Sequence, residues 1–241
     1  MRELPILVSA PMVRANLEGR KTVTRRVVKP QPSADHKWQG WCLSGMHASD
    51  AGKACWGVPS TPNSYRDPID IMPPYEVGDR LYVREAWRVP ASLDARSGKQ
   101  IAEDCIAAGY RAPWCPIKYE ADGALNSAKD WQDFGSTLAE ATPGRYRHAR
   151  FMPRWASRIT LEVTAVRVER LQDITEEQAR AEGLLRDSDG WRGAPDLPWF
   201  ASPVAAFRSL WESINGASSW ADNPWVWVVE FKRIDREARA A

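Results

Sequence analysis

The sequence contains few of the residues that most often bind metals, and its cysteines lack the spacing of metal ligands. Its 241 residues include only three histidines and four cysteines, with no C-x-x-C pair. We therefore expect no metal and no other cofactor. Scattered cysteines of this kind are typical of reduced cytosolic thiols, so we expect all four to be reduced. A zinc site formed by Cys42, His47 and Cys55 remains an alternative.

Long apolar runs are also missing. No stretch approaches the length needed to cross a bilayer, and the first residues lack a basic start followed by an apolar segment. These absences predict a cytoplasmic protein that does not bind membranes. The hydrophobic content of 44% and charged content of 27% are ordinary for a globular protein of one or two domains.

The net charge is low, but the basic residues are unevenly distributed. A formal charge of +2 does not by itself indicate a nucleic-acid-binding protein. Two basic runs stand out, one between Arg14 and Lys29 and one between Arg145 and Arg158. They could form a surface that faces phosphates, or they could be solvated loops, and the sequence supports both interpretations.

The densest of these basic stretches runs from Gly19 to Arg26. Gly19 follows a short helical segment and is typical of a helix stop, after which a β-rich run begins at Thr22. In a regular strand Thr24 and Arg26 would share one face and Lys21 would point to the other. Lys21 and Thr24 could therefore meet only if the backbone turns or bulges between them.

Four segments together resemble one known family. They are Gly19-x-Lys21-x-x-Thr24-x-Arg26, Gly78 to Val83, Ile159 to Leu171 with the Thr175-Glu176-Glu177 that follows, and Trp227 to Lys232. Their order and content resemble the ASCH family, a branch of the PUA-like β-barrels. The small bacterial members that hydrolyse N4-acetylcytidine look like a shortened version of this chain. The whole layout is similar to longer ASCH proteins that are common in phages and prophages.

The resemblance implies an α+β, mainly β fold, in which one PUA-like (ASCH) β-barrel carries short flanking helices. It implies a single domain over residues 1–241, with core segments 1–30, 76–90, 150–183 and 203–235. Two insertions, 31–75 and 90–149, have no counterpart in the small relatives. The first is rich in Pro, Gly, Ser and Asp, which predicts a long loop or irregular lobe. The second reads as loop with short helical pieces and one strand within Ile117–Glu120.

The resemblance also implies the catalytic residues Lys21, Thr24 and Glu182. Lys21 would act as a base, and Thr24 would be the nucleophile or would position a water. Glu182 would orient Lys21 or carry the proton to the leaving amine, although an ion pair with Lys21 would raise the lysine pKa and oppose the base role. Glu182 ends a helix that begins with a Thr175–Gln178 capping box and stops at Gly183. From its position alone, Glu182 would be an exposed glutamate.

Three further residues are candidates for substrate binding: Arg25, Arg26 and Glu85. Glu85 lies on a predicted strand from Arg80 to Val89, on the same face as the apolar Leu81 and Val83, so it should point inward. A buried carboxylate needs a partner, which makes Glu85 either one half of an internal salt bridge with an arginine or a second catalytic acid.

The expected function is hydrolysis of the amide that joins an acyl group to N4 of cytosine, in a nucleoside or nucleotide, without a metal. The alternatives are a non-catalytic module that binds RNA or a modified base, and a ribonuclease. RNA is thus a second candidate partner, and the sequence indicates no oligomeric state. The 13 tryptophans could stack on a base or pack the insertions onto the core.

Overall fold

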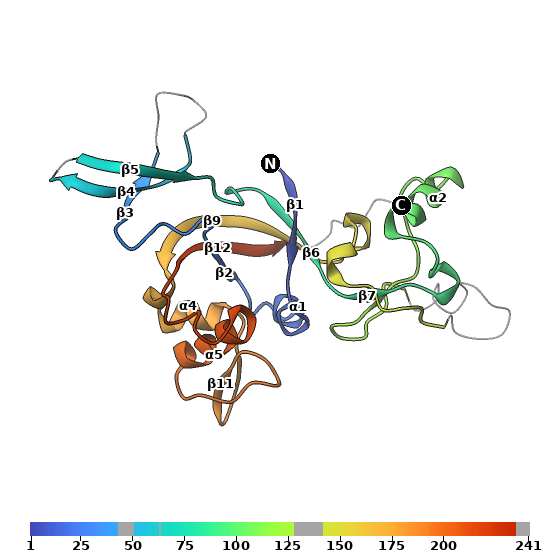
Figure 1. Ribbon diagram of the computed structural model, residues 1–241. Helices are drawn as coiled ribbons and strands as arrows, with labels where there is room; N and C mark the ends of the chain where they lie inside the picture. Colours follow the sequence, from blue (N-terminus) through green and yellow to red (C-terminus); the bar gives the residue numbers. More distant parts are fainter. Residues whose placement is uncertain (43–50, 63, 128–141, 235–241) are drawn as a thin grey trace. The chain divides into compact units, whose positions relative to one another are not determined.

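The computed structural model describes residues 1–42, 51–62, 64–127 and 142–234 (Figure 1). The described chain is α+β and consists mainly of strands, as expected. It divides into two compact units built from alternating segments of the sequence. One unit comprises Met1–Lys21, Asp79–Glu162 and Lys232–Ala241, and the other comprises Thr22–Gly78 and Val163–Phe231. Among the described residues, no helix is both long and apolar enough to cross a membrane.

The first unit contains the N-terminal strand and helix. Strand β1 (Glu3–Leu7) pairs in parallel with β6 (Arg80–Arg84), which pairs in antiparallel fashion with the beginning of β9 (Thr160–Arg170). Helix α1 (Ala10–Leu17) has a proline in its first turn and is followed by Gly19 with φ of 75°. The expected helix stop at Gly19 is therefore confirmed.

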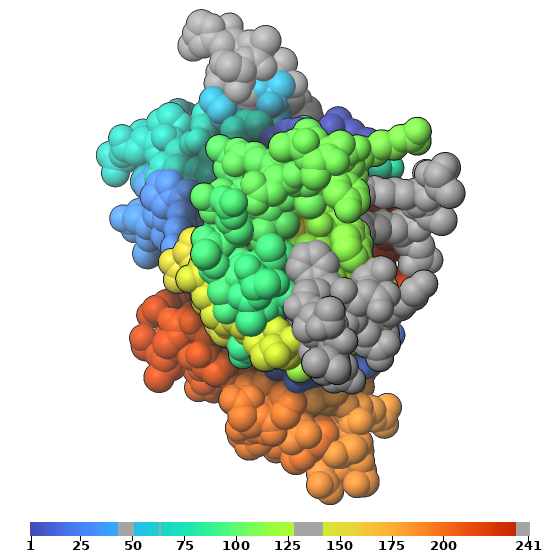
Figure 2. All heavy atoms as spheres, turned by 90° about the vertical axis from the view of Figure 1, so that its right-hand side faces the viewer, coloured from blue at the N-terminus to red at the C-terminus, as the bar shows by residue number. Residues whose placement is uncertain are grey.

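The predicted strand from Arg80 to Val89 is wrong as a single element. The chain breaks at Glu85, and β7 (Trp87–Arg88) pairs with β8 (Lys118–Tyr119), which confirms the strand expected in the second insertion. The insertion also contains α2 (Gly98–Ala107), which begins with a complete capping box. Around α2, the green spheres of Figure 2 form one continuous mass. Three short 3-10 turns complete this unit: Ala91–Leu93, Ala149–Phe151 and Arg154–Ala156.

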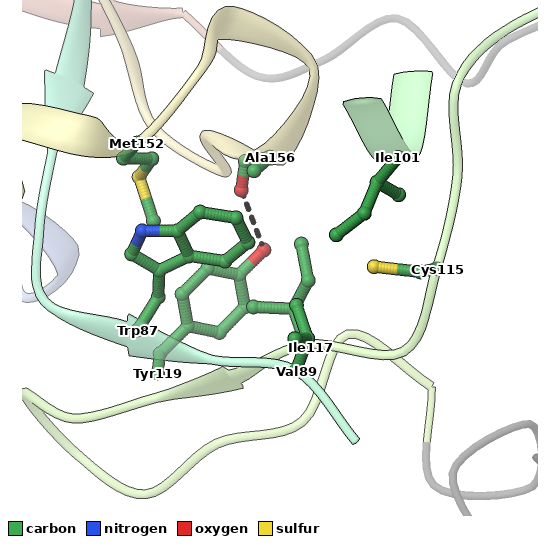
Figure 3. Close-up of a cluster of buried hydrophobic side chains, with 8 residues drawn as sticks. All are labelled: Trp87, Val89, Ile101, Cys115, Ile117, Tyr119, Met152 and Ala156. Atoms are coloured by element: carbon green, nitrogen blue, oxygen red, sulfur yellow. Dashed lines mark hydrogen bonds between the residues drawn. The ribbon is translucent and has the colours of Figure 1, made fainter. Parts of the chain in front are cut away.

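A separate hydrophobic cluster explains why the second insertion is ordered in its described part (Figure 3). Trp87 is completely buried, and Tyr119 lies beside it in the cluster. The Tyr119 hydroxyl donates a hydrogen bond to the Ala156 carbonyl at 3.1 Å, so its one polar group is satisfied. The insertion thus shares an apolar core with the segments that flank it, which supply Trp87, Met152 and Ala156.

The second unit is built on β2 (Val23–Val27) and β12 (Trp225–Ile234), which pair in antiparallel fashion. Their register places Arg25 opposite Val228 and Thr24 opposite Val229, so these two pairs point to opposite faces. The unit also contains most of β9. Its remaining elements after β9 are a 3-10 turn at Leu171–Asp173, α4 (Glu176–Ala181), β10 (Leu185–Asp187), β11 (Gly190–Arg192) and α5 (Pro203–Asn215).

The described residues of the first insertion form a regular sheet, so the expectation of a loop or irregular lobe is wrong for them. Strands β3 (Lys37–Trp41), β4 (Ala54–Thr61) and β5 (Ser64–Ile71) form an antiparallel sheet in that order (Figure 1). The prolines that suggested a loop are tolerated because Pro68 lies on an edge strand and Pro59 lies next to a break in register.

Tryptophans attach this three-stranded sheet to β12 within the second unit. The rings of Trp41 and Trp227 are stacked with centroids 6.1 Å apart, and Trp56 meets Trp225 edge-on at 5.9 Å. Trp38 contacts both Trp56 and Trp225. For these residues the structure supports the packing role rather than the base-stacking role.

The strand pairings described above form open sheets in each unit. The described residues of neither unit close into a barrel, so the α+β class is seen but the expected PUA-like barrel is not. The expectation of a single domain stays a prediction.

Candidate functional site

Lys21 follows α1 in a tight turn of the first unit. The backbone amides of Arg20 and Lys21 both donate to the carbonyl of Ala15, at 2.9 and 3.1 Å. The Lys21 side chain is buried, with only 6% of the residue exposed. Lysine is rarely buried to this degree, so Lys21 itself does not belong to a solvated loop.

Thr22 directly precedes β2 in the second unit and ties this strand, called the signature strand below because it carries Thr24 and Arg26 of the Gly19–Arg26 motif, to the end of helix α4. Its amide donates to the carbonyl of Ala181 at 2.9 Å, and its own carbonyl accepts from the amide of Phe231 at 2.9 Å. The strand that carries Thr24 is thereby fixed beside the residue that precedes Glu182. Thr24 itself is buried, although threonine is usually exposed.

Glu182 is buried, with 3% of the residue exposed, so the exposed glutamate suggested by its position is wrong. It caps α4 after the predicted Thr175–Gln178 capping box, and Gly183 follows with φ of 95°. One carboxylate oxygen accepts a hydrogen bond from Nη1 of Arg25 at 3.2 Å. The guanidinium compensates a negative charge at the negative end of the helix dipole.

Arg25, expected to bind substrate, lies in a network of protein contacts. Its side chain has no exposed surface. Besides Glu182, it donates to Glu169 at 3.1 Å and to the Gln178 side-chain oxygen at 3.0 Å, and it lies over the Phe207 ring. Its Nε is buried and has no hydrogen-bond partner among the described residues. The Nε–H group of Arg25 is therefore a strong donor without an acceptor in this network.

The network continues along one face of the strands of the second unit. Arg167 forms ion pairs with Glu169 of its own strand and with Glu230 of β12. These two carboxylates hold the pKa of Arg167 above its ordinary value, against the opposing effect of burial. Sequence reasoning missed Glu169 and Gln178. In the sequence, only the Thr175–Gln178 capping box pointed to Gln178. In the structure, the Gln178 side-chain oxygen that accepts from the Thr175 amide also accepts from Arg25.

Arg26 is exposed and points to the opposite face of β2 from Arg25. Its positive charge acts on Tyr75, at the end of the first insertion. Burial raises the pKa of Tyr75 above its ordinary value, and the nearby Arg26 lowers it in part. Arg26 is therefore accessible, as a substrate-binding cation must be, and it lies near a phenol that stays protonated at neutral pH.

Glu85 belongs to a different cluster, in the first unit. It is buried, and both of its oxygens accept from Arg158 at 2.8 Å. Arg158 also pairs with Asp122 at 2.9 Å and lies over the Tyr119 ring. Burial raises the pKa of Glu85, and the hydrogen bonds and charge of Arg158 offset this only in part. The structure therefore confirms the inward orientation and the internal salt bridge.

Two of the four cysteines differ from expectation. Cys42 and Cys55 form a disulfide with their Cα atoms 6.4 Å apart, so the prediction that all four cysteines are reduced is wrong. The register of β3 and β4 brings the two residues to adjacent positions, which their sequence spacing could not reveal. Cys105 and Cys115 are free thiols. His47, the third ligand of the alternative zinc site, lies outside the described residues.

Comparisons of this chain with protein-family profiles, with curated proteins and with solved structures find no match. The site must therefore be interpreted from its own geometry and from the sequence motifs. Buried polar residues concentrate around the signature strand, where Arg25 links Glu182 to Glu169 and Gln178. This concentration is typical of a functional site, because burying so many ionised groups contributes little to stability.

Proposed function

We propose that this protein is a long member of the ASCH family that hydrolyses N4-acylated cytosine, as a nucleoside or nucleotide. The reaction breaks the amide between the acyl carbon and N4 and consumes one water. It releases a carboxylic acid and the free cytosine amine. In this proposal, the open sheets of this chain correspond to the β-barrel of the PUA-like relatives.

The residues that carry the proposed reaction are Lys21, Thr24 and Glu182. The neutral amine of Lys21 removes a proton from the Thr24 hydroxyl or from a water, and that oxygen attacks the acyl carbon. The tetrahedral intermediate then collapses, the C–N bond breaks, and N4 leaves with the proton that Lys21 took up, which Lys21 delivers directly or through the Glu182 carboxylate. If Thr24 is the nucleophile, a water then hydrolyses the resulting ester. Arginines of the signature supply positive charge for the oxyanion.

The observation that carries the proposal is the burial of Glu182 against Arg25. The helix dipole disfavours a negative charge at a helix C-terminus, and burial of a carboxylate is also unfavourable. A buried glutamate there therefore needs a cation from another element. That cation comes from the signature strand itself, between Thr24 and Arg26. The part of the chain most similar to the amidohydrolases is thus joined to the glutamate that the same resemblance identified.

The decisive experiment is a turnover assay with N4-acetylcytidine, followed by the ultraviolet change as cytidine forms. Lys21→Ala, Thr24→Ala and Glu182→Ala should each remove nearly all turnover while the circular dichroism spectrum stays unchanged. The double variants should lose little more, because residues that act as a unit are strongly non-additive. Matched controls are Thr22→Ala and Glu177→Ala, which change exposed side chains next to the same elements.

Absence of turnover in the wild-type protein, together with RNA binding that falls steeply as salt rises, would replace the enzyme with a binding module. RNA cleavage without deacylation would support the ribonuclease instead. Loss of activity in the Thr22 or Glu177 control equal to that in the Thr24 or Glu182 variant would show that the site had been assigned to the wrong residues.

A further inference from the structure

Three ligand-type side chains converge on one face of the β3–β4–β5 sheet. The strand register places Cys55 opposite Gly40 on one side and Asp70 on the other, and Cys42 follows Gly40 by two positions. Residues directly opposite each other, or two apart in a strand, share a face of the sheet. Cys42, Cys55 and Asp70 therefore project from the same face, with their ligand atoms all within 4.8 Å of one another.

The other face of the same sheet carries the tryptophans. A register shift between Trp38 and Gly40 puts both Trp38 and Trp41 on the face of Ala54 and Trp56, although they are three residues apart. This is the face that packs against Trp225 and Trp227 of β12. The cysteine–aspartate cluster therefore points away from the tryptophan contact and is open to exchange with solvent, since Asp70 is exposed.

The chemistry of these ligands favours zinc. Two thiolates select soft or borderline cations over Mg²⁺ and Ca²⁺, and a carboxylate completes sets of three protein ligands in zinc sites. In a tetrahedral zinc site the ligand atoms lie about 3.5–4 Å apart, which is within the 4.8 Å span of the three ligand atoms here. The fourth position would hold a water.

We propose that the reduced form of this cluster binds Zn²⁺ through the thiolates of Cys42 and Cys55 and the carboxylate of Asp70. The disulfide is then the oxidised, metal-free form of the same site. In the conversion, two thiolates, one molecule of hydrogen peroxide and two protons give the disulfide and two waters, and the cation is released. A dithiol reductant reverses the change by taking the two sulfur atoms back to thiols.

This site is separate from the proposed hydrolysis and does not depend on it. A zinc ion bound here would link β3, β4 and β5, whereas the disulfide links only β3 and its neighbour β4. The sheet that carries Trp38, Trp41 and Trp56 would thus be cross-linked in both redox states, with the third strand included only when zinc is bound.

The test uses the full chain in two states: reduced anaerobically with a phosphine that is then removed, and oxidised with hydrogen peroxide. Each is titrated with Zn²⁺ against a chromophoric chelator, and with Co²⁺ to observe thiolate-to-metal charge-transfer bands. One tightly bound zinc per chain is expected in the reduced state and none in the oxidised state. Asp70→Asn should weaken zinc binding at least tenfold without preventing disulfide formation, whereas Asp67→Asn on the same strand should not change the affinity.

Cys42→Ser and Cys55→Ser should each abolish the charge-transfer bands, while Cys105→Ser should keep them. The proposal is overturned if the reduced protein binds no zinc or if the oxidised protein binds it equally well. Asp70→Asn with unchanged affinity would remove the carboxylate from the ligand set. Because Asp70→Asn changes an exposed side chain, it remains informative even if a cysteine variant fails to fold.

Discussion

Arg25 and Glu182 are separated by 157 positions in the sequence, and their side chains form a buried ion pair with an N···O distance of 3.2 Å. The arginine is the last residue but one of the stretch from Gly19 to Arg26, and the glutamate ends a helix. The pair joins the strand that follows Lys21 to the helix end that carries the proposed catalytic glutamate. It also gives Arg25 a role in holding the site together, in addition to any role in binding substrate.

Replacing Arg25 should test that role directly. Arg25→Ala leaves the buried carboxylate of Glu182 without this partner, and breaking such a pair costs about 3–5 kcal/mol in unfolding free energy. In a double-mutant cycle of wild type, Arg25→Met, Glu182→Gln and the double variant, the double variant should lose less than the sum of the two single variants. Urea unfolding of all four proteins measures the coupling.

Arg208 provides the matched control, because its ion pair with Glu212 lies on the exposed side of α5. Arg208→Ala should change the unfolding free energy by no more than about 0.5 kcal/mol. Additive losses for the Arg25 and Glu182 variants would show that their contact contributes nothing to stability.

Glu85 should make stability depend on pH in an unusual direction. Burial raises its pKa above the ordinary 4.5, so the folded state favours the protonated form. The stability that this contributes is fully present below pH 4.5 and is lost as pH rises through the folded-state pKa. The advantage of wild type over Glu85→Gln should therefore be larger at about pH 4 than at about pH 7. An advantage that instead grew with pH would show that the Arg158 ion pair outweighs burial.

The cysteines should react in a defined order. Without reductant the native protein should show little reaction at Cys115, because burial raises the pKa of its thiol to about 12, helped by the nearby Cys105. Only the thiolate reacts, so a buried, high-pKa cysteine is inert. Unfolding without reductant should release two thiols, and unfolding with reductant all four. Four reactive thiols without reductant would contradict the Cys42–Cys55 disulfide.

Chelation should separate catalysis from the proposed zinc site. The proposed hydrolysis uses Lys21, Thr24 and Glu182 without a metal, so the rate of deacylation should be the same before and after dialysis against EDTA. The same treatment should remove any zinc bound at Cys42, Cys55 and Asp70. A rate that falls to zero in EDTA and returns only with zinc would overturn the metal-independent mechanism.

Local signals in the sequence predicted some features correctly. The helix stop at Gly19, the Thr175–Gln178 capping box and the inward orientation of Glu85 all depend on a few neighbouring residues, and all three are confirmed. Each of these features depends on residues within one or two helical turns, or within a few positions of one strand. Propensity and periodicity therefore detect them.

Features that depend on distant pairing were not predictable in the same way. The contacts of Arg25 with Glu169 and Gln178 join residues more than a hundred positions apart. The sheet of the first insertion was missed because prolines and glycines usually mark loops, yet here they lie at an edge strand and at register shifts. The Cys42–Cys55 disulfide follows from the same register, and so it was missed as well.

The tryptophan contacts between the first insertion and β12 have an optical consequence. Indole rings at centroid separations of 5.0 to 6.4 Å couple their electronic transitions, and Trp38, Trp41, Trp56, Trp225 and Trp227 form one connected set at these separations. Coupled chromophores of fixed geometry give a strong exciton couplet in circular dichroism. This protein therefore carries an intrinsic spectroscopic reporter. Separation of the inserted sheet from β12 would remove the couplings to Trp225 and Trp227 and leave those among Trp38, Trp41 and Trp56, so the couplet would change while the helical signal persisted.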